Sequence, residues 1–157
     1  MSTTINRHIV ILLVAVCLFI SCDNSIVYHQ FQHTAQEGWD ARDSITFVTD
    51  TIREDGTYTT YLCLRASADY PFQNLCVVTK QTPQPGSITT SRWLNIRIKE
   101  PDGQPDGNGT VLYTQEIPLH TMQLKQGDSL RIVVAQHMKR EVIQGIKDVG
   151  VKVIRNR

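Results

Sequence analysis

The sequence lacks an apolar run long enough to cross a membrane as a helix. Its longest run, Ile9 to Ile20, has twelve residues, whereas a helix needs about 20 residues to span a hydrocarbon core of roughly 30 Å. Net charge is also scarce, because 16 Lys and Arg residues stand against 15 Asp and Glu residues. A chain with balanced charge has no strong positive electrostatic potential to attract a polyanion, so nucleic acid is not an expected partner.

The familiar catalytic motifs are absent as well. The chain has no Gly-x-Ser-x-Gly elbow, no glycine-rich phosphate loop ending in Gly-Lys-Ser/Thr, and no His-Glu-x-x-His pair. We therefore predict a protein that is not an enzyme, with no catalytic residue and no cofactor. A hydrolase with an unrecognised site remains a rival hypothesis.

The N-terminus has the order of an export signal. Arg7 and His8 precede the apolar run, and Ser21 and Cys22 follow it. The segment Phe19 to Cys22 resembles the lipobox of bacterial lipoproteins. This resemblance implies that residues 1–21 are a cleaved signal peptide and that Cys22 carries a covalent lipid, palmitate included, which anchors the mature chain to a membrane.

The rest of the chain alternates between apolar and polar residues with the period of half-buried strands. Leu94, Ile96 and Ile98 on one face, with Trp93 on the other, give the clearest example. Turn residues separate the segments, and few stretches would fit a helix. We predict an all-β fold, an antiparallel β-sandwich of about seven to eight strands, in residues 44–157, with residues 22–43 as an acylated N-terminus and tether. The expected strands are 44–50, 57–65, 75–82, 92–99, 110–117, 129–135 and 149–153.

Two cysteines remain in the predicted domain once Cys17 has left with the signal and Cys22 is acylated. Cys63 and Cys76 lie on consecutive predicted strands, and a hairpin centred on Asp69 and Tyr70 would place them opposite each other. An oxidising compartment permits a disulfide at this spacing. Two buried free thiols explain the pair equally well.

Two groups of residues have a superficial likeness to metal ligands. His29, His33 and Glu37 have helical spacing, but their segment has little helical periodicity. The loop containing Asp102, Gln104, Asp106 and Asn108 lacks the terminal Glu and the flanking helices of a calcium loop. We expect solvated polar residues in the first case, a turn in the second, and no metal site.

Trp93 is the best candidate for contact with another molecule. Strict alternation places it with Arg97 and Lys99 on the outer face of a strand. An exposed Trp beside cations suits either a protein partner or the ring of a sugar. The alternative is that a loop covers it.

The C-terminal third carries a family resemblance. The run from Ala135 to Val153 resembles the closing segment of the gliding-motility lipoproteins called GldH, through a Gln-x-Met, Gly-Ile and Asp-Val-Gly pattern. Tyr28, Trp39 and the segment Asp69 to Leu75 add to it. The matching motif residues are Gln136, Met138, Gly145, Asp148 and Gly150.

The resemblance implies a lipoprotein of Bacteroidota on the periplasmic face of the outer membrane, with envelope proteins of the gliding and type IX secretion machinery as partners. Asp23 would signal inner-membrane retention under the enterobacterial rule, which is not expected to hold in that group. Ser44, Thr51 and Ser129 match the Asp, Ser/Thr, aliphatic pattern of O-glycosylation there. Turn formation by the same residues is the alternative.

Overall fold

The computed structural model describes residues 25–156, so the predicted signal peptide and Cys22 lie outside the described residues. Within this range every regular element is a β-strand. The fold is therefore all-β, as the alternating pattern predicts. The ten strands are β1 (Ile26–His33), β2 (Trp39–Asp40), β3 (Ser44–Val48), β4 (Gly56–Ser67), β5 (Asn74–Gln84), β6 (Thr90–Arg97), β7 (Leu112–Leu124), β8 (Ser129–Gln136), β9 (Val142–Ile143) and β10 (Ile146–Arg155).

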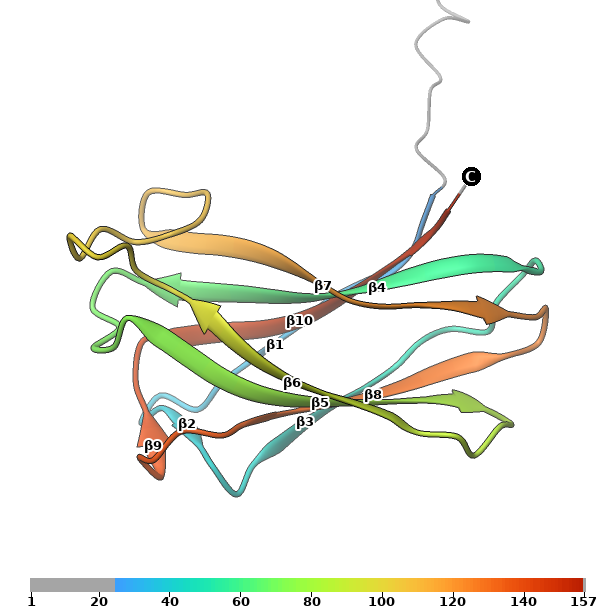
Figure 1. The fold of residues 1–157 in the computed structure, drawn as a ribbon, viewed down its shortest axis with the longest axis horizontal. Helices are drawn as coiled ribbons and strands as arrows, with labels where there is room; N and C mark the ends of the chain where they lie inside the picture. The colour runs from blue at the N-terminus through green and yellow to red at the C-terminus, as the bar shows by residue number, and fades with distance from the viewer. Residues whose placement is uncertain (1–24, 157) are drawn as a thin grey trace, which may run out of the picture.

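Two four-stranded antiparallel sheets form the two layers of a sandwich (Figure 1). The first sheet has the strand order β1-β10-β4-β7, and the second has the order β3-β8-β5-β6. The short pair β2 and β9 lies at one end of the sandwich. The eight longer strands agree with the predicted number.

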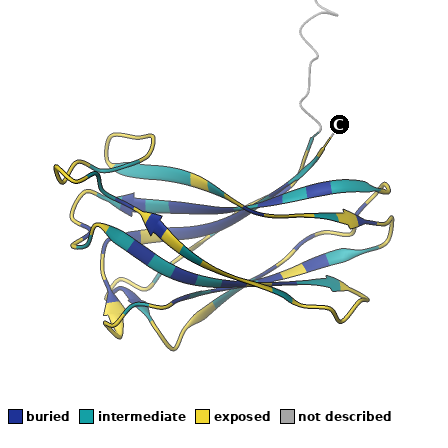
Figure 2. Cartoon of the chain, viewed as in Figure 1, coloured by how far each residue is buried: buried dark blue, intermediate teal, exposed yellow. Residues whose placement is uncertain are grey.

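The core fills the space between the two sheets because alternate side chains of each strand point inward. Val149, Val151 and Val153 of β10 are fully buried, as are Leu62 and Leu64 of β4. The second sheet contributes the buried side chains of Leu75, Val77, Leu130, Ile132 and Val134. Figure 2 shows the result as buried and more exposed segments that alternate along the strands, with the exposed residues gathered at the turns.

The expected strands are all present, with ends shifted by up to seven residues, but three strands were missed, namely β1 and the short strands β2 and β9. Residues 26–33, which the sequence suggested were part of a tether, form β1 at the edge of the first sheet. Trp39, in β2, is buried too. The sandwich thus begins at β1 and not at residue 44.

Two expected connections are also different. The segment between β4 and β5 carries the chain from the first sheet to the second, so these strands do not form a hairpin. For residues 136–145 the sequence suggests a short helical turn or a long hairpin loop between the last two strands, but this segment crosses between the sheets, from β8 to β10 through β9. Across residues 25–156 the structure has no helix that is long and apolar enough to cross a membrane.

Candidate functional site

The outer face of the first sheet carries a row of four residues that strand pairing places side by side. Phe31 pairs with Gly150, Gly150 with Cys63, and Cys63 with Glu116. Paired residues of neighbouring strands project to the same face. Side chains from β1, β4 and β7 therefore meet over β10.

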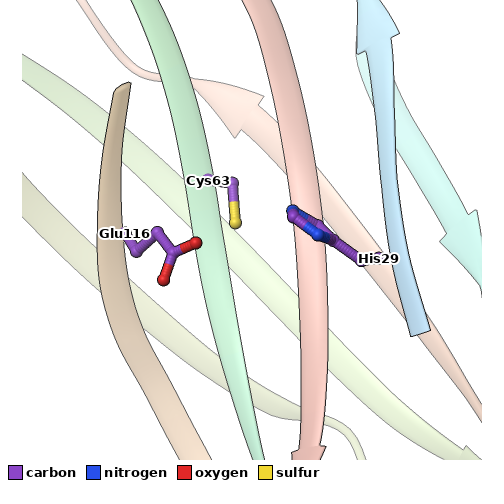
Figure 3. Close-up of side chains that lie close together, drawn as sticks. All are labelled: His29, Cys63 and Glu116. Carbon is purple, nitrogen blue, oxygen red and sulfur yellow. The ribbon is translucent and has the colours of Figure 1, made fainter. Parts of the chain in front are cut away.

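Gly150 makes this meeting possible because it leaves a gap in the middle of the row. A Cβ atom at this position would lie 2.6 Å from Cδ1 of Phe31 and 2.8 Å from the carbonyl oxygen of Gln30. The ring of Phe31 fills the gap, and the ring of His29 packs beside it with centroids 5.2 Å apart. In Figure 3 the imidazole of His29 points across β10 toward Cys63, and Glu116 points toward the same sulfur from the other side.

Cys63 lies at the centre of this group and is fully buried although it projects from the outer face. Burial and, to a smaller extent, the nearby carboxylate of Glu116 together raise the pKa of its thiol to about 12, against the smaller opposing effects of Lys152 and Arg65. The thiol is therefore neutral at physiological pH. A buried neutral thiol is a poor nucleophile, which argues against covalent catalysis at Cys63.

Charged and aromatic side chains surround the group. The guanidinium carbon of Arg65 lies 3.8 Å from the centroid of the Phe31 ring, a distance that favours a cation–π contact. Lys152 forms an ion pair with Oε2 of Glu116. The outer face of the first sheet is thus a connected network of charge and aromatic contacts.

Asp148 extends this network toward the end of β10. Its carboxylate is almost fully buried. Its Oδ1 accepts no hydrogen bond from the described residues but lies beside Nδ1 of His33, an ion pair when that imidazole is protonated, and its Oδ2 lies 3.6 Å from a guanidinium nitrogen of Arg65. Buried carboxylates need such partners because removing a charge from water is costly. Asp148 and Gly150 of the motif therefore both organise this outer face.

The other motif residues build the crossing between the sheets. The buried amide of Gln136 donates hydrogen bonds to the carbonyls of Glu141 at 3.0 Å and Arg140 at 3.3 Å, and its oxygen accepts one from the Met138 backbone at 2.8 Å. The sulfur of Met138 accepts a hydrogen bond from the backbone of Cys76 at 3.2 Å. These residues have structural roles within the described chain.

Gly145 completes the crossing with a tight backbone contact. Its φ is +89°, and a Cβ atom there would lie 2.5 Å from the Cα atom of Tyr70. Only glycine adopts this conformation readily and fits this close to another backbone. The phenol of Tyr70 is buried, which raises its pKa above the ordinary value.

The second sheet presents Trp93 on its edge strand β6. The side chain is 64% exposed, and its ring meets the ring of His137 edge to face with centroids 4.4 Å apart. No loop covers it in the part of the chain that the structure describes. Trp93 is thus available for contact on one outer face of the sandwich.

Arg97 and Lys99 are less free than Trp93. Arg97 is tied to the following loop by ion pairs with Glu100 at 2.9 Å and Asp106 at 3.2 Å, and Lys99 is half-buried. Arg97 also lines a groove of about 730 Å³ between the edge strands β6 and β7. The three residues therefore do not form one flat platform.

The two cysteines lie in different sheets. Cys63 projects from the outer face of the first sheet, whereas Cys76 of β5 belongs to the second sheet and has its sulfur 3.7 Å from the side-chain oxygen of Asn95. Both are free thiols. The expectation that a hairpin places them opposite each other is wrong, because the strands that carry them do not pair.

The structure does not bring together the residues of either group that resembles a set of metal ligands. His29 and His33 lie on a strand and not on a helix, and Glu37 follows it in a loop. Asp102 accepts a hydrogen bond from the backbone of Gln104, and Asp106 pairs with Arg97, as in a turn. Neither set is a metal-ligand cluster within residues 25–156.

The three predicted glycosylation positions differ in exposure. Ser44 and Thr51 are exposed, but Ser129 is half-buried at the start of β8. The carboxylate of Asp128 accepts a hydrogen bond from the backbone of Lys125, so it also stabilises a turn. Modification of these hydroxyls stays a prediction.

A family model supplies the decisive comparison. The model of the GldH lipoproteins matches residues 26–153, from the first residue of β1 to within β10. The chain belongs to the GldH lipoprotein family. The resemblance noted in the closing segment is thereby confirmed, and the match includes the strand β1 that the sequence pattern missed.

Two curated GldH relatives match over nearly their whole length. The gliding motility lipoprotein GldH of Flavobacterium johnsoniae is 26% identical over 151 residues, which cover 91% of this chain and 93% of the relative. The GldH homolog of Christiangramia forsetii is 22% identical over 152 residues, covering 91% and 92%. The two alignments therefore leave no whole domain of this chain or of either relative unmatched.

Solved structures resemble this GldH chain only distantly. A family GH115 4-O-methyl-α-glucuronidase has a TM-score of 0.45 and 11% identity, and the match covers 87% of this chain but 18% of the enzyme. A likeness of this size carries no argument about function.

Proposed function

We propose that this GldH-family chain is a lipid-anchored protein of the cell envelope and a non-enzymatic component of the gliding-motility and type IX secretion machinery. Cys22 carries the lipid, and the sandwich stands on the periplasmic face of the outer membrane. The match of the family model over residues 26–153 carries this proposal, and the printed names of both relatives refer to gliding motility.

The site chemistry supports a binding role and not catalysis. The one buried thiol of the first outer face is held neutral, and the exposed face of the second sheet offers an aromatic ring. Exposed Trp side chains are frequent anchors of protein interfaces because they bury much area at a small cost in conformational entropy. We therefore place the contact with envelope partners around Trp93 and the adjoining ring of His137.

A matched pair of crosslinking positions tests the partner surface. A photoreactive amino acid replaces Trp93 in one strain and Val48 in another, since Val48 is 52% exposed on the opposite edge strand of the same sheet. We expect crosslinks to gliding or secretion components at position 93 and few at position 48. Equal crosslinking from both positions would contradict the assignment of this surface.

The same residue separates this proposal from binding of a carbohydrate. A sugar ring stacks on an exposed Trp, so Trp93→Ala would abolish retention on envelope polysaccharide if the protein were a glycan-binding module. Under our proposal Trp93→Ala weakens recovery of protein partners and leaves any retention on polysaccharide unchanged. Both measurements use the same membrane preparation.

Substitution of the lipidated residue tests the anchor. Cys22→Ala removes the sulfur that accepts the lipid, so we expect an unprocessed precursor, loss of palmitate labelling and absence from the outer-membrane fraction. Cys76→Ser is the control because Cys76 lies within the sandwich. A Cys22→Ala protein that is processed and fractionated like the natural protein rules out the anchor.

A further inference from the structure

Three potential metal ligands from three strands converge on the outer face of the first sheet. A ring nitrogen of His29, the sulfur of Cys63 and a carboxylate oxygen of Glu116 all lie within 4.8 Å of one another (Figure 3). Within residues 25–156 no other group of His, Cys, Asp and Glu side chains meets this condition. We propose that these three side chains bind one zinc ion.

The donor set selects the class of metal. One imidazole nitrogen, one thiolate sulfur and one carboxylate oxygen form a combination that suits zinc, which accepts all three ligand types. Calcium and magnesium prefer oxygen ligands alone. The site therefore discriminates against the two most abundant divalent cations.

Small movements bring the three atoms to ligand distance. At metal–ligand distances of roughly 2.0 to 2.3 Å, two ligand atoms of a tetrahedral zinc ion lie about 3.5 Å apart. Cys63 is fixed in the sheet by its burial, whereas His29 and Glu116 are exposed and rotate about their side-chain bonds. Closing the group by about an ångström therefore needs no movement of the backbone.

The surroundings support the ligands. Gly150 leaves space over β10 that the ring of Phe31 fills, and Phe31 in turn packs against the imidazole of His29. Lys152 holds Oε2 of Glu116, so the other carboxylate oxygen remains for the metal. An outer partner of this kind orients a metal-bound carboxylate and contributes to affinity.

Binding exchanges a proton for the ion. The zinc ion replaces the proton on Cys63, and this proton passes to the solvent, so the sulfur is bound as thiolate. Three protein ligands occupy three of four tetrahedral positions and leave the fourth for water. The bound ion would link the edge strand β1 to β4 and β7 and would stabilise the first sheet.

Titration with the metal alone tests the proposal. The full chain, purified in detergent and freed of metal, is titrated with zinc chloride by calorimetry, and with cobalt(II) as a spectroscopic probe. We expect one ion per chain, a thiolate-to-cobalt charge-transfer band, and a rise in Tm with zinc. His29→Ala and Glu116→Gln each weaken binding at least about tenfold, and Cys63→Ser removes the charge-transfer band.

Two control variants match the tested residues closely. His33→Ala removes the other histidine of the same face of β1, and Cys76→Ser removes the other thiol of the sandwich. Both keep the stoichiometry and the band. Because His29 and Glu116 are exposed, their variants retain the fold, as circular dichroism verifies. Binding that His29→Ala leaves unchanged, or a natural chain that binds no more zinc than Cys63→Ser, overturns the proposal.

Discussion

Phe31 of β1 and Gly150 of β10 are paired residues, and the phenyl ring occupies the space that a Cβ atom on Gly150 would need. The pair explains why glycine stands in the middle of a buried strand, where its backbone freedom is otherwise unfavourable. It also connects the Asp-Val-Gly motif to a strand more than one hundred residues away.

Gly150→Ala should therefore destabilise the sandwich by about 1–3 kcal/mol, as in other overpacked cores. Chemical denaturation measures the effect. In the double variant with Phe31→Ala the ring no longer blocks the new methyl group, so the combined loss should be smaller than the sum of the single losses. Strict additivity would show that the ring does not occupy this space. The contact with the Gln30 carbonyl remains, so recovery is partial.

Gly145→Ala and Gly127→Ala form a second informative pair. Both glycines have positive φ, +89° and +95°, but a Cβ atom would meet the backbone of Tyr70 at 2.5 Å in the first case and nothing within 4 Å in the second. Gly127→Ala should cost about 1–2 kcal/mol through conformation alone, and Gly145→Ala should cost more. Equal losses would mean that the crossing relaxes away from Tyr70.

Gln136→Leu should loosen the crossing between the sheets. The substitution leaves the carbonyl of Arg140 and the backbone amide of Met138 without their present partner, whereas the carbonyl of Glu141 keeps a hydrogen bond from the Ala41 backbone. An unsatisfied group costs about 1–3 kcal/mol when buried, and these hydrogen bonds are part-buried, so chemical denaturation should show a fall of about 1–3 kcal/mol in the free energy of unfolding. The control is Arg131→Leu at an exposed position of the same strand, which should change stability by less than about 0.5 kcal/mol. Equal effects of the two substitutions would contradict the role of the Gln136 amide.

The two cysteines should behave as separate free thiols. Because β4 and β5 lie in different sheets, the intact mass of the protein should not change on reduction, and a thiol reagent should modify two sulfurs in the denatured sandwich. In the folded protein Cys76 should react before Cys63, since Cys63 is fully buried and Cys76 is half-buried. A mass increase of two hydrogens on reduction would demonstrate a disulfide.

Asp40 should titrate with an unusually low pKa. Hydrogen bonds from the side chain and backbone of Arg42 lower the pKa of this carboxyl to about 2, so the contribution of this contact is present above the unfolded pKa and disappears as the pH falls through about 2. Carboxyl chemical shifts measured by NMR check the value. Arg42→Ala should move the pKa up toward the ordinary 3.8. An unchanged low pKa in that variant would exclude Arg42 as the cause.

The alternation of apolar residues was enough to predict seven strands, because a strand with one buried face must repeat with a period of two. β1 was not predicted because it lacks this period of two, and the cause is physical. Its two large aromatic residues project to opposite faces, with Tyr28 in the core and Phe31 over Gly150. An edge strand packed on both sides in this manner has no clean alternation.

The cluster of His29, Cys63 and Glu116 was beyond the reach of sequence patterns. Its members are far apart along the chain. They meet only because β1, β10, β4 and β7 lie next to one another, in that order, in the first sheet. An alternating pattern shows which face of a strand is buried, but it shows neither the sheet to which the strand belongs nor the strands that pair with it. Because the pattern does not show which strands pair, the sequence also suggested a hairpin between β4 and β5, and this prediction was wrong. By contrast, the exposure of Trp93 follows directly from alternation.

The position of β10 also has a consequence for how the protein is made. This strand lies between β1 and β4, so the first sheet cannot close until all the chain between residues 33 and 146 has been synthesised. Such remote pairing delays folding, because the ends of a long loop must first find each other. A nascent polypeptide of this topology stays unfolded for longer, and an unfolded polypeptide is the form that can thread through a narrow export channel.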